Sequence, residues 1–558
     1  MVSPVTVFTA RRIHTMSPSV PTAEAVAVRD GRIIAVGSLE DMAAYGPHTH
    51  DDRFAGAVML PGFVEAHCHV MVGGGWKFTY VGYFDRTDPR GRVWSGCRDT
   101  SSVIDRLAEA AAAMDADPLV GPKDPLIAWG LDPIYLEGPR LDAHDLDRAC
   151  DHRPIFVFHS SAHLATVNTA MMEISGIDAD TPVPGVSRRP DGQPDGELQE
   201  PAAMALARIG YSALARAMRG PEPIRTLGRL ANRAGITTFA DLGTTRPDVE
   251  EGLKAWIDTV EDPSFPARAV VAGSLMGGSG TPEERARLAA ELKGHDTDKL
   301  RFGLVKIVLD GSIQGLTARV GFPGYHNGAP NGLWLIPPEQ MPDLVGAFHR
   351  AGLTVHCHCN GDEAVDVFLD AVERALVDHP RPDHRHTVQH CQLTTEAQYR
   401  RMARLGMCAN IFSNHIYYWG DQHAAITLGP TRAAAMDACA TAARHGVPFA
   451  LHTDAPVTPL SPLASVWSAV TRITASGRVL GPGERIPVDL ALRGITIDAA
   501  FQLNMDHEIG SIEVGKFADF AILEEDPLEV EPAELRNIGV LATVLGGEVF
   551  TVPDPDGD

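Results

Sequence analysis

Residues 58–69 read VMLPGFVEAHCH, a short apolar run that ends in two histidines separated by one residue. Seven further apolar runs follow, and stretches with helical periodicity, such as 338–352 and 395–406, lie between them. Apolar strands that alternate with helices are typical of a parallel sheet covered on both faces. The eight runs are VMLPGFVEAH (58–67), GITTFADLG (235–243), ARAVVAGSL (267–275), FGLVKIVLDG (302–311), LTVHCHC (353–359), HTVQHCQ (386–392), MCANIFSN (407–414) and VPFALHTD (447–454).

About eight strand–helix units favour an α/β fold in which the strands close into a (β/α)8 TIM-like barrel. An open, doubly wound sheet is the alternative architecture for the same alternation. The first two strands are separated by a long insertion at about residues 70–225, which contains strand-like runs and a Pro/Gly-rich stretch. We expect a segment of this length to have its own structure and to cover the mouth of the barrel.

Both ends of the chain have the alternating pattern of antiparallel strands. Residues 23–37 read AEAVAVRDGRIIAVG, with a type I′ turn predicted at Asp30-Gly31, and residues 538–552 read IGVLATVLGGEVFTV, with a turn at Gly546-Gly547. We therefore expect one small composite β-sandwich domain built from both termini. The predicted division of the chain is 1–58 plus 505–553 for this domain, 59–504 for the barrel with its insertion, and 554–558 for a tail.

Composition restricts the partners of this chain. Its 558 residues include 48 basic and 72 acidic side chains, which gives a formal net charge of -24. This charge disfavours binding to nucleic acid or to an anionic membrane. The sequence contains neither the run of about 18 apolar residues that a transmembrane helix needs nor the pattern of a signal peptide. Eight scattered cysteines without a CxxC pair indicate a reducing compartment, so we expect a cytoplasmic protein.

His67 and His69 stand at the end of the first predicted strand. Side chains at positions i and i+2 of a strand project from the same face, so both imidazoles can reach one point. Neutral imidazole is a common ligand for zinc and similar ions. An isolated His-x-His pair is more often structural, but the carboxyl ends of barrel strands are where the active sites of such folds lie.

Further candidate ligands end later predicted strands. Lys306 lies inside an apolar run, where a cation is costly unless it is paired or modified; alternatively, its stem is buried and its charge reaches the barrel mouth. Each candidate alone is more readily explained as a structural residue. Together they mark the ends of the first, fourth, fifth, sixth and eighth strands, which share one rim. The later candidates are His356, His358, His390, His452 and Asp454.

An ordered set of segments resembles the amidohydrolase superfamily, most closely its amidohydrolase-3 branch of YtcJ-like and N-substituted formamide deformylase-like proteins. The segments are PGFVEAHCH, KIVLDGS, HCHCNGD, QHCQ and HTDAPVTPL, supported by AHLATVN (162–168), GELQE (196–200) and GSIEVGKFADFAIL (510–523). The resemblance extends over nearly the whole chain. The ordered set is specific to this family, although each segment alone is not.

The resemblance implies a centre of two divalent ions, zinc by default, with manganese or another divalent ion as the alternative. His67 and His69 would bind the more buried ion, and a carboxylated Lys306 would bridge the two. Asp454 would contact a metal and act as the general base. The remaining ligands implied by the family pattern are His358, chosen over its neighbour His356, and His390.

Several positions depart from the family pattern. Gln389 replaces a common glutamate, and His452 stands where a small residue is usual. Cys68, Cys359 and Cys391 occupy places where other residues are usual, so they are either thiolate ligands or buried inert cysteines, and the second interpretation is favoured. These departures affect the expected substrate more than the expected metal.

Residues in the predicted loops are candidates for substrate contact. Aromatic rings at a barrel mouth suit a flat or apolar substrate group, whereas the alternative is that these rings pack against the insertion. The residues assigned to substrate binding are Trp76, His163, His415, Tyr418 and His452.

The function that the resemblance implies is hydrolysis of a non-peptide C–N bond by metal-activated water. The bond would be an amide, formamide or cyclic amide bond of a small substrate that is aromatic or N-substituted. The alternatives are a mononuclear deaminase or decarboxylase of the same superfamily, with Lys306 unmodified, and a non-catalytic binding protein. A small molecule is the expected partner. We also expect a homodimer, only because homodimers are the commonest oligomers of soluble proteins.

Overall fold

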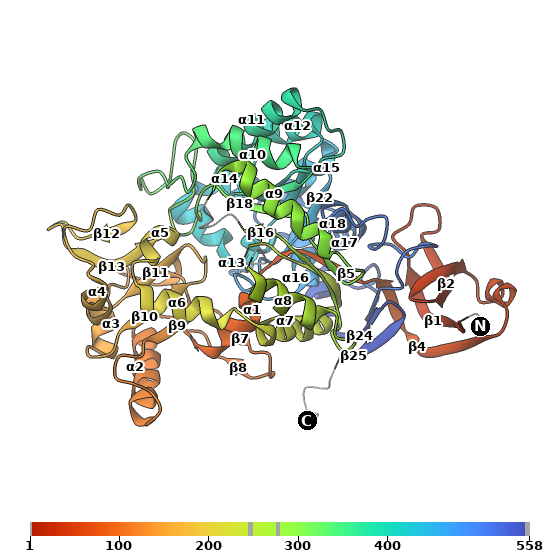
Figure 1. Ribbon diagram of the computed structural model, residues 1–558, viewed down its shortest axis with the longest axis horizontal. Coiled ribbons are helices and arrows are strands. Elements are labelled where there is room, and N and C mark those ends of the chain that lie inside the picture. Colours follow the sequence, from red (N-terminus) through yellow and green to blue (C-terminus); the bar gives the residue numbers. More distant parts are fainter. Residues whose placement is uncertain (1–2, 244–248, 275–279, 553–558) are drawn as a thin grey trace.

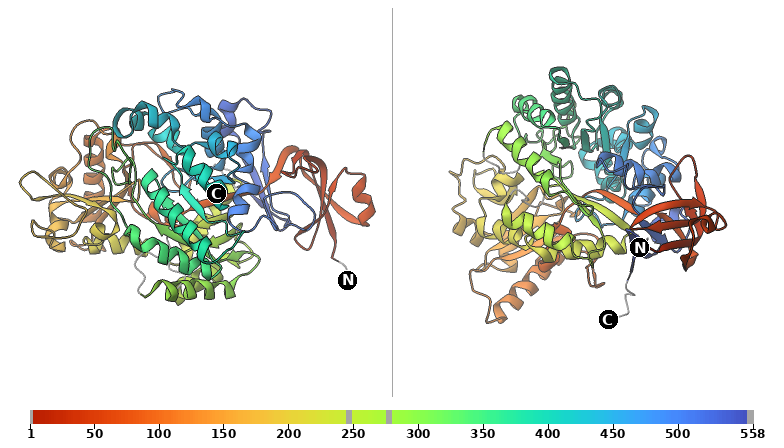
Figure 2. Two further views of the ribbon diagram at one scale, coloured as in Figure 1. Left: turned by 90° about the horizontal axis from the view of Figure 1, so that it is seen from above. Right: turned by 45° about the vertical axis from the view of Figure 1, so that its right-hand side comes forward.

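The computed structural model describes residues 3–243, 249–274 and 280–552. Three regions are visible in Figure 1: an insertion coloured orange to yellow, a central region of strands and helices, and a sheet at the opposite end that contains the N-terminus. The two further views in Figure 2 show the same order along the long axis. The tail predicted at 554–558 lies outside the described residues.

The central region contains parallel strands that pair in chain order, which confirms the α/β class. The strand predicted at 267–275 is divided into two short strands, β15 and β16, which belong to different central sheets: β15 pairs with β17 in one, and β16 pairs with β18 in the other. The strands are β5 (Phe63–Cys68), β14 (Ile236–Asp241), β15 (Arg268–Val271), β16 (Gly273–Ser274), β17 (Leu300–Arg301), β18 (Leu304–Val308), β19 (Thr354–Cys359), β20 (Thr387–His390), β21 (Cys408–Ile411) and β22 (Phe449–Leu451).

Helices connect these strands and bury their outer faces in a large hydrophobic cluster. Two of the helices described in this region begin with a side-chain cap; Thr395, for example, forms a capping box with Gln398 at the start of α12. The helices of this region are α7 (Pro221–Arg233), α8 (Glu250–Val260), α9 (Pro282–Leu292), α10 (Met341–Arg350), α11 (Asp362–Asp378), α12 (Glu396–Leu405), α13 (Asn414–Gln422), α14 (Gly429–Ala435), α15 (Cys439–Arg444), α16 (Pro462–Thr471), α17 (Val488–Arg493) and α18 (Ile497–Gln502).

The first predicted strand, 58–67, is divided between two sheets. β4 (His48–Pro61) belongs to the terminal sheet and β5 begins the central strands, so Gly62 marks the boundary. A Cβ atom at Gly62 would lie 2.0 Å from Thr237 Oγ1, which is far inside van der Waals contact. The chain passes from one sheet to the other at a place where only glycine fits. The uninterrupted apolar pattern does not reveal this boundary.

The insertion has its own sheet, in the order β12-β13-β11-β10-β9-β6. Arg86 fixes it to the central region by donating hydrogen bonds to the carbonyls of Pro456 and Val457, at 2.8 and 2.7 Å. Its elements are α1 (Met71–Gly74), β6 (Thr79–Tyr80), β7 (Arg86–Thr87), β8 (Val93–Trp94), α2 (Thr100–Ala116), β9 (Leu126–Leu131), α3 (Ala143–Ala149), β10 (Ile155–His159), β11 (Leu164–Val167), α4 (Thr169–Ser175), β12 (Val186–Arg188), β13 (Pro194–Gln199), α5 (Glu200–Met204) and α6 (Arg208–Ala217).

Strands from both ends of the chain form one seven-stranded sheet, in the order β25-β24-β23-β4-β1-β2-β3. Both predicted hairpin turns are present, with positive φ at Asp30 and Gly31 and at Gly546 and Gly547. The two facing layers of a sandwich stay a prediction. The strands not yet given bounds are β1 (Val5–His14), β2 (Thr22–Arg29), β3 (Arg32–Gly37), β23 (Phe520–Leu523), β24 (Val540–Leu545) and β25 (Glu548–Thr551).

A buried ion pair joins the terminal sheet to the central strands. Arg268 on β15 donates from Nε and Nη2 to the Asp519 carboxylate at 2.7 and 3.0 Å, and each side chain is only 3% exposed. The guanidinium also lies 3.7 Å from the centre of the Phe517 ring. Asp519 in turn accepts a hydrogen bond from the backbone of Gly546, so one carboxylate ties three segments together.

We expect Asp519→Leu to lower the free energy of unfolding by about 3–5 kcal/mol, because Arg268 would remain buried without its counter-ion. The matched control is Asp258→Ala, which removes an exposed i,i+4 partner of Lys254 and should cost about 1 kcal/mol or less. Urea unfolding followed by circular dichroism measures both effects. Equal losses in the two variants would contradict a joining role for the buried pair.

Candidate metal centre

His67, His69 and Asp454 converge where the first and last central strands end. Asp454 Oδ1 lies 3.3 Å from His67 Nε2 and 3.0 Å from His69 Nε2. The donor atoms of the three side chains all lie within 4.8 Å of one another. Two imidazoles and a carboxylate at this spacing form a donor set that zinc and similar divalent ions accept.

Two further predicted ligands lie directly beside this group, and the third lies one side chain away. Lys306 Nζ is 3.1 Å from His67 Nε2, and His390 Nδ1 is 3.7 Å from Asp454 Oδ2. His358 is stacked edge-on against His390, with 4.5 Å between ring centroids, but its Nε2 lies 3.2 Å from the carbonyl oxygen of Gly311. The predicted strand ends therefore do come together.

The backbone at two of these strand ends is in the left-handed region. His390 has φ 74° and Asp454 has φ 51°, and the residue after His390, Cys391, has φ 54°. Such angles are unfavourable for side chains with a Cβ atom and persist only where the surrounding structure imposes them. Here His390 is the last residue of β20, and Asp454 follows the last residue of β22 by three positions, so both angles coincide with side chains that converge.

Burial sets the protonation states of the group. It lowers the pKa of His67 and of His390 well below the ordinary histidine value, so both imidazoles are neutral at pH 7. Burial alone would raise the pKa of Asp454, but His67 and His69 hold it well below its usual range. Neutral imidazole and ionised carboxylate are the forms that bind metal ions. Burial also lowers the pKa of Lys306 to about 8.

A second observation also indicates that this group of side chains could bind a divalent cation. His390 Nε2 is buried and has no hydrogen-bond partner among the described residues. A buried nitrogen without a partner is costly, and a bound metal ion would satisfy it. The fit is most direct for one ion held by His67, His69 and Asp454.

Two buried polar residues behind the group were missed by the sequence analysis. Glu65 accepts hydrogen bonds from the backbone and hydroxyl of Thr453, at 3.1 and 2.9 Å, and burial raises its pKa to about 8. Asn410 bonds to Gln389 and to His452. The available signal was a polar side chain inside an apolar strand run, because such a group must find a partner when it is buried.

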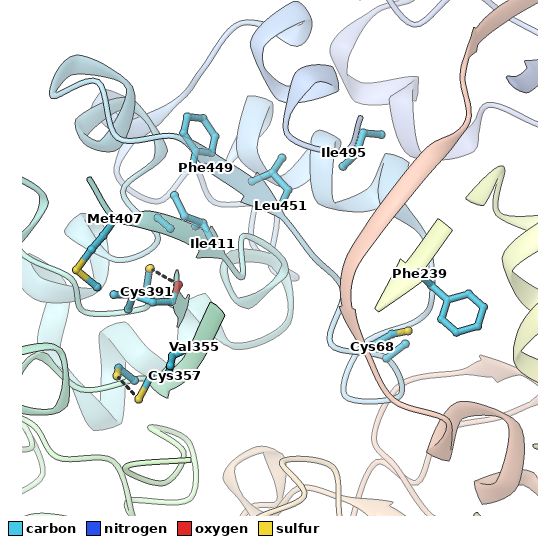
Figure 3. Packing of buried hydrophobic residues seen from close by; sticks show 14 of the residues in the cluster. Cys68, Phe239, Val355, Cys357, Cys391, Met407, Ile411, Phe449, Leu451 and Ile495 are labelled. Atoms are coloured by element: carbon cyan, nitrogen blue, oxygen red, sulfur yellow. Dashed lines mark hydrogen bonds between the residues drawn. The ribbon is translucent and has the colours of Figure 1, made fainter. Parts of the chain in front are cut away.

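The cysteines next to the ligands are not part of the metal centre. Cys68, Cys359 and Cys391 belong to the hydrophobic cluster on the outer side of the strands, and Figure 3 draws Cys68 and Cys391 among its apolar side chains. Burial raises the pKa of Cys391 to about 12, and raises those of Cys68 and Cys359 well above the ordinary value. All three are therefore thiols at neutral pH, which agrees with the inert interpretation.

A cavity of about 750 Å³ has the predicted ligands on its floor. The insertion supplies much of its apolar wall, which agrees with the prediction that it covers this end of the strands. The ligands in the lining are His67, His69, Lys306, His358, His390 and Asp454, and the apolar side chains from the insertion include Met71, Phe158, Met204, Leu214 and Met218.

Of the five residues predicted to bind substrate, His163 alone is in the lining of this cavity. Trp76 packs instead on Trp129, with 5.0 Å between centroids, and Tyr418 on Phe84 at 4.9 Å. These contacts are the packing alternative stated for the aromatic residues. His415 is buried and bonds to His423, and His452 is buried and bonds to His390 and Asn410.

His163 comes from the insertion and is paired with a carboxylate. Its Nδ1 lies 2.7 Å from Glu200 Oε2, and its ring centroid lies 4.9 Å from that of His358. Burial opposes the charged imidazole, but the charge of Glu200 and the hydrogen bond to it raise the pKa of His163 above the ordinary value. The insertion thus brings a hydrogen-bond donor to the edge of the candidate metal centre.

Comparison with known proteins agrees with this geometry. A sequence model described as amidohydrolase family matches residues 55–551. The chain is 26% identical over 555 residues to putative amidohydrolase YtcJ of Bacillus subtilis, covering 96% of this chain and 97% of that protein. It is also 26% identical over 554 residues to N-substituted formamide deformylase of Arthrobacter pascens, covering 96% of each chain. The resemblance predicted from the motifs is confirmed.

A solved structure supports the fold. The crystal structure of an uncharacterized metal-dependent hydrolase from Pyrococcus horikoshii superposes with a TM-score of 0.68 at 18% identity, covering 95% of this chain and 99% of that chain. Among the residues described here, no helix is both long and apolar enough to cross a lipid bilayer.

We expect Glu200→Gln to lower the pKa of His163, because the carboxylate that contributes most against the effect of burial would be lost. An NMR titration of histidine-labelled protein measures this pKa, and His163→Asn identifies the signal by its loss. Glu197→Gln is the matched control, since Glu197 pairs with Arg140 elsewhere in the insertion. An unchanged pKa in Glu200→Gln would contradict the pairing.

Proposed function

The chain belongs to the amidohydrolase family, and from this premise we propose that it is a metal-dependent hydrolase of a non-peptide carbon–nitrogen bond. The observation that carries the proposal is the convergence of His67, His69 and Asp454 on the floor of a cavity with apolar walls. The proposed substrate is a small amide, formamide or cyclic amide whose nitrogen bears an apolar or aromatic group.

We propose that two divalent ions, zinc by default, occupy the centre. His67, His69 and Asp454 would hold one, and His358 and His390 the other, with a carboxylated Lys306 between them. Bound ions would supply Lewis-acid chemistry, which lowers the pKa of water and polarises a carbonyl group. Supporting this proposal, burial lowers the pKa of Lys306 to about 8, and only the neutral amine can add to carbon dioxide, losing a proton as the carbamate forms.

Asp454 is the proposed general base and acid. Its carboxylate faces the cavity and is ionised, so it can accept a proton from the attacking water and return it to the leaving nitrogen. One water is consumed, the C–N bond breaks, and a carboxylic acid and an amine are released. His163, held by Glu200, would donate a hydrogen bond to a polar atom of the substrate.

The insertion determines the proposed substrate class. Phe158, Met204, Leu214 and Met218 form an apolar wall opposite the polar floor. Such a wall favours an apolar group on the substrate nitrogen and excludes water from the reacting carbonyl, while methionine side chains adapt to groups of different shape. The similar protein from Arthrobacter pascens is named as an N-substituted formamide deformylase, which agrees with this class.

A one-ion deaminase is the second candidate function. It is favoured by the environment of His358, whose Nε2 is shared between the carbonyl of Gly311 and the amide of Asn360, at 3.2 and 3.0 Å. In that state Lys306 would keep its ammonium group, and His358 would not be a ligand. The reaction would release ammonia without dividing the carbon skeleton.

The finer features of the fold are proposed with this function. We propose that the central strands close into a (β/α)8 barrel, supported by the hydrogen bond from Asp454 N–H to the carbonyl of His67 at 3.1 Å. All eight cysteines are buried free thiols, which supports the proposed cytoplasmic location.

We expect the protein to carry about two equivalents of divalent metal per chain and to hydrolyse N-substituted formamides. A chelator should abolish turnover, and zinc or manganese should restore it. Asp454→Asn should reduce kcat by about 100-fold to 10,000-fold, whereas Asp147→Asn, a control at a carboxylate that bonds to Thr169 in the insertion, should not. Metal content below half an equivalent, without activation by added ions, would contradict the proposal.

Carboxylation of Lys306 makes a separate prediction. Removing carbon dioxide and bicarbonate from metal-free protein before zinc is added should reduce both the recovered activity and the second equivalent of metal. Bicarbonate should restore both, because it regenerates the carbon dioxide that forms the carbamate. Full recovery of activity with one equivalent of metal in the absence of bicarbonate, with release of ammonia, would favour the one-ion deaminase.

A further inference from the structure

Behind the candidate metal centre lies a chain of buried, hydrogen-bonded side chains. We propose that Gln389, Asn410 and His452 form a hydrogen-bonded relay that fixes which ring nitrogen His67 and His390 present to the metal centre. The functional consequence of the relay rests on the proposed function. All three residues are fully buried, and none is in the lining of the cavity, so they act as positioning residues.

The relay is continuous from one ligand to the other. His67 Nδ1 lies 2.7 Å from Gln389 Oε1, and Asn410 Nδ2 lies 2.9 Å from the same oxygen. On the other side of Asn410, its Oδ1 lies 3.1 Å from His452 Nδ1, and His452 Nε2 lies 3.2 Å from His390 Nδ1. The five side chains are therefore linked by four short contacts.

Hydrogen-bonding rules leave two directions for this chain. In one, His67 Nδ1–H donates to Gln389 and Asn410 donates to the same oxygen. In the other, both amides are turned over and every donor and acceptor is reversed, so that His67 carries its proton on Nε2. Each direction satisfies the two amides internally, and a contact outside the chain must decide between them.

In the metal-free protein, with Lys306 unmodified, Lys306 selects one of the two directions. Its Nζ lies 3.1 Å from His67 Nε2, and an ammonium group has donors but no acceptor. His67 Nε2 must therefore accept, and the proton of this imidazole is on Nδ1. The Gln389 oxygen then accepts from His67, while its amide nitrogen donates to His356 Nδ1 at 2.7 Å. The contact selects the first direction for the whole relay.

The selected direction gives both ligands the same tautomer. Asn410 Oδ1 accepts from His452 Nδ1–H, which leaves His452 Nε2 as the acceptor for His390 Nδ1–H. His390 Nε2 is then a bare lone pair, and it is the buried nitrogen for which the described residues offer no partner. Two ligands on different strands, His67 and His390, thus present Nε2 to the same centre.

His452 is a positioning residue rather than a ligand. Its donor atoms lie within 4.8 Å of those of His67 and His390, but its ring is stacked on that of His67, with an interplanar angle of 11° and 4.9 Å between centroids. The lone pair of an imidazole nitrogen lies in the ring plane. Two nearly parallel, stacked rings cannot direct their lone pairs to one ion, so His452 acts through His390.

Neutron diffraction from crystals of the full-length, metal-free protein grown in D2O tests the relay without reference to any ion. We expect deuterium on Nδ1 of His67, His390 and His452, and none on Nε2 of these residues. Deuterium on Nε2 of His67 or His390 would overturn the proposal. The outcome does not depend on whether the proposed function is correct.

If the relay orients the ligands, its loss should weaken metal binding. Zinc affinity, measured by competition with a chelating dye, tests this consequence. Gln389→Met and His452→Phe remove an acceptor but retain bulk, and each should weaken zinc binding by about 10- to 100-fold. Gln389→Glu retains the oxygen that accepts from His67, so it should bind zinc at least as tightly as the parent. His423→Phe, a buried histidine that bonds to His415 and Thr427 outside the relay, is the matched control and should not change affinity.

The pattern across the variants separates the relay from general damage. Parent affinity in both Gln389→Met and His452→Phe, or equal losses in Gln389→Glu and Gln389→Met, would overturn the relay. Near-ultraviolet circular dichroism establishes that each variant is folded, and His452→Phe preserves ring stacking on His67 if Gln389→Met does not fold. Failure of the parent itself to bind zinc would refute the proposed function, and the deuterium positions would then decide the relay alone.

Discussion

The backbone hydrogen bond from Asp454 N–H to the carbonyl of His67 joins the end of the last central strand to the end of the first, and the candidate site depends on it. A second bond, from His69 N–H to the carbonyl of Ala455, lies beside it at 2.9 Å. These contacts bring an acid and two imidazoles from distant parts of the sequence into one group. The left-handed backbone of Asp454 is tolerated because the paired strand ends impose it.

Two layers with different physical properties surround that junction. Behind the candidate metal centre, Gln389 and Asn410 are fully buried and hydrogen-bonded to each other, and Gln389 contacts His67. On the cavity side, the insertion supplies Phe158 and Met218 to the lining, and these apolar side chains require no hydrogen-bonding groups on a substrate. The hydrogen-bonded layer supports the side chains that would carry out the chemistry. The apolar layer from the insertion can differ for a different substrate without altering that support.

The strand ends could be predicted from the sequence because an apolar run followed by histidine, lysine or aspartate is a local signal. Lys306, His390 and Asp454 were found in this way, and the structure brings them together. The roles of Trp76 and Tyr418 could not be predicted, because their partners Trp129 and Phe84 are set by how the insertion folds. A local pattern gives the face of a strand, but not which loop will lie against it.

Charge links the number of ions in the centre to the state of Lys306. Beside the ionised Asp454, Glu65 has its pKa raised to about 8 and is largely protonated at neutral pH, and Gln389 contributes an uncharged amide. With Lys306 as an ammonium, Asp454 would be the only ionised carboxylate among the proposed ligands. Carboxylation replaces a positive group by a negative one in a buried site, where unbalanced charge is most costly. In the proposed two-ion centre the carbamate would balance the charge of the second ion, whereas one ion at His67, His69 and Asp454 would not need it.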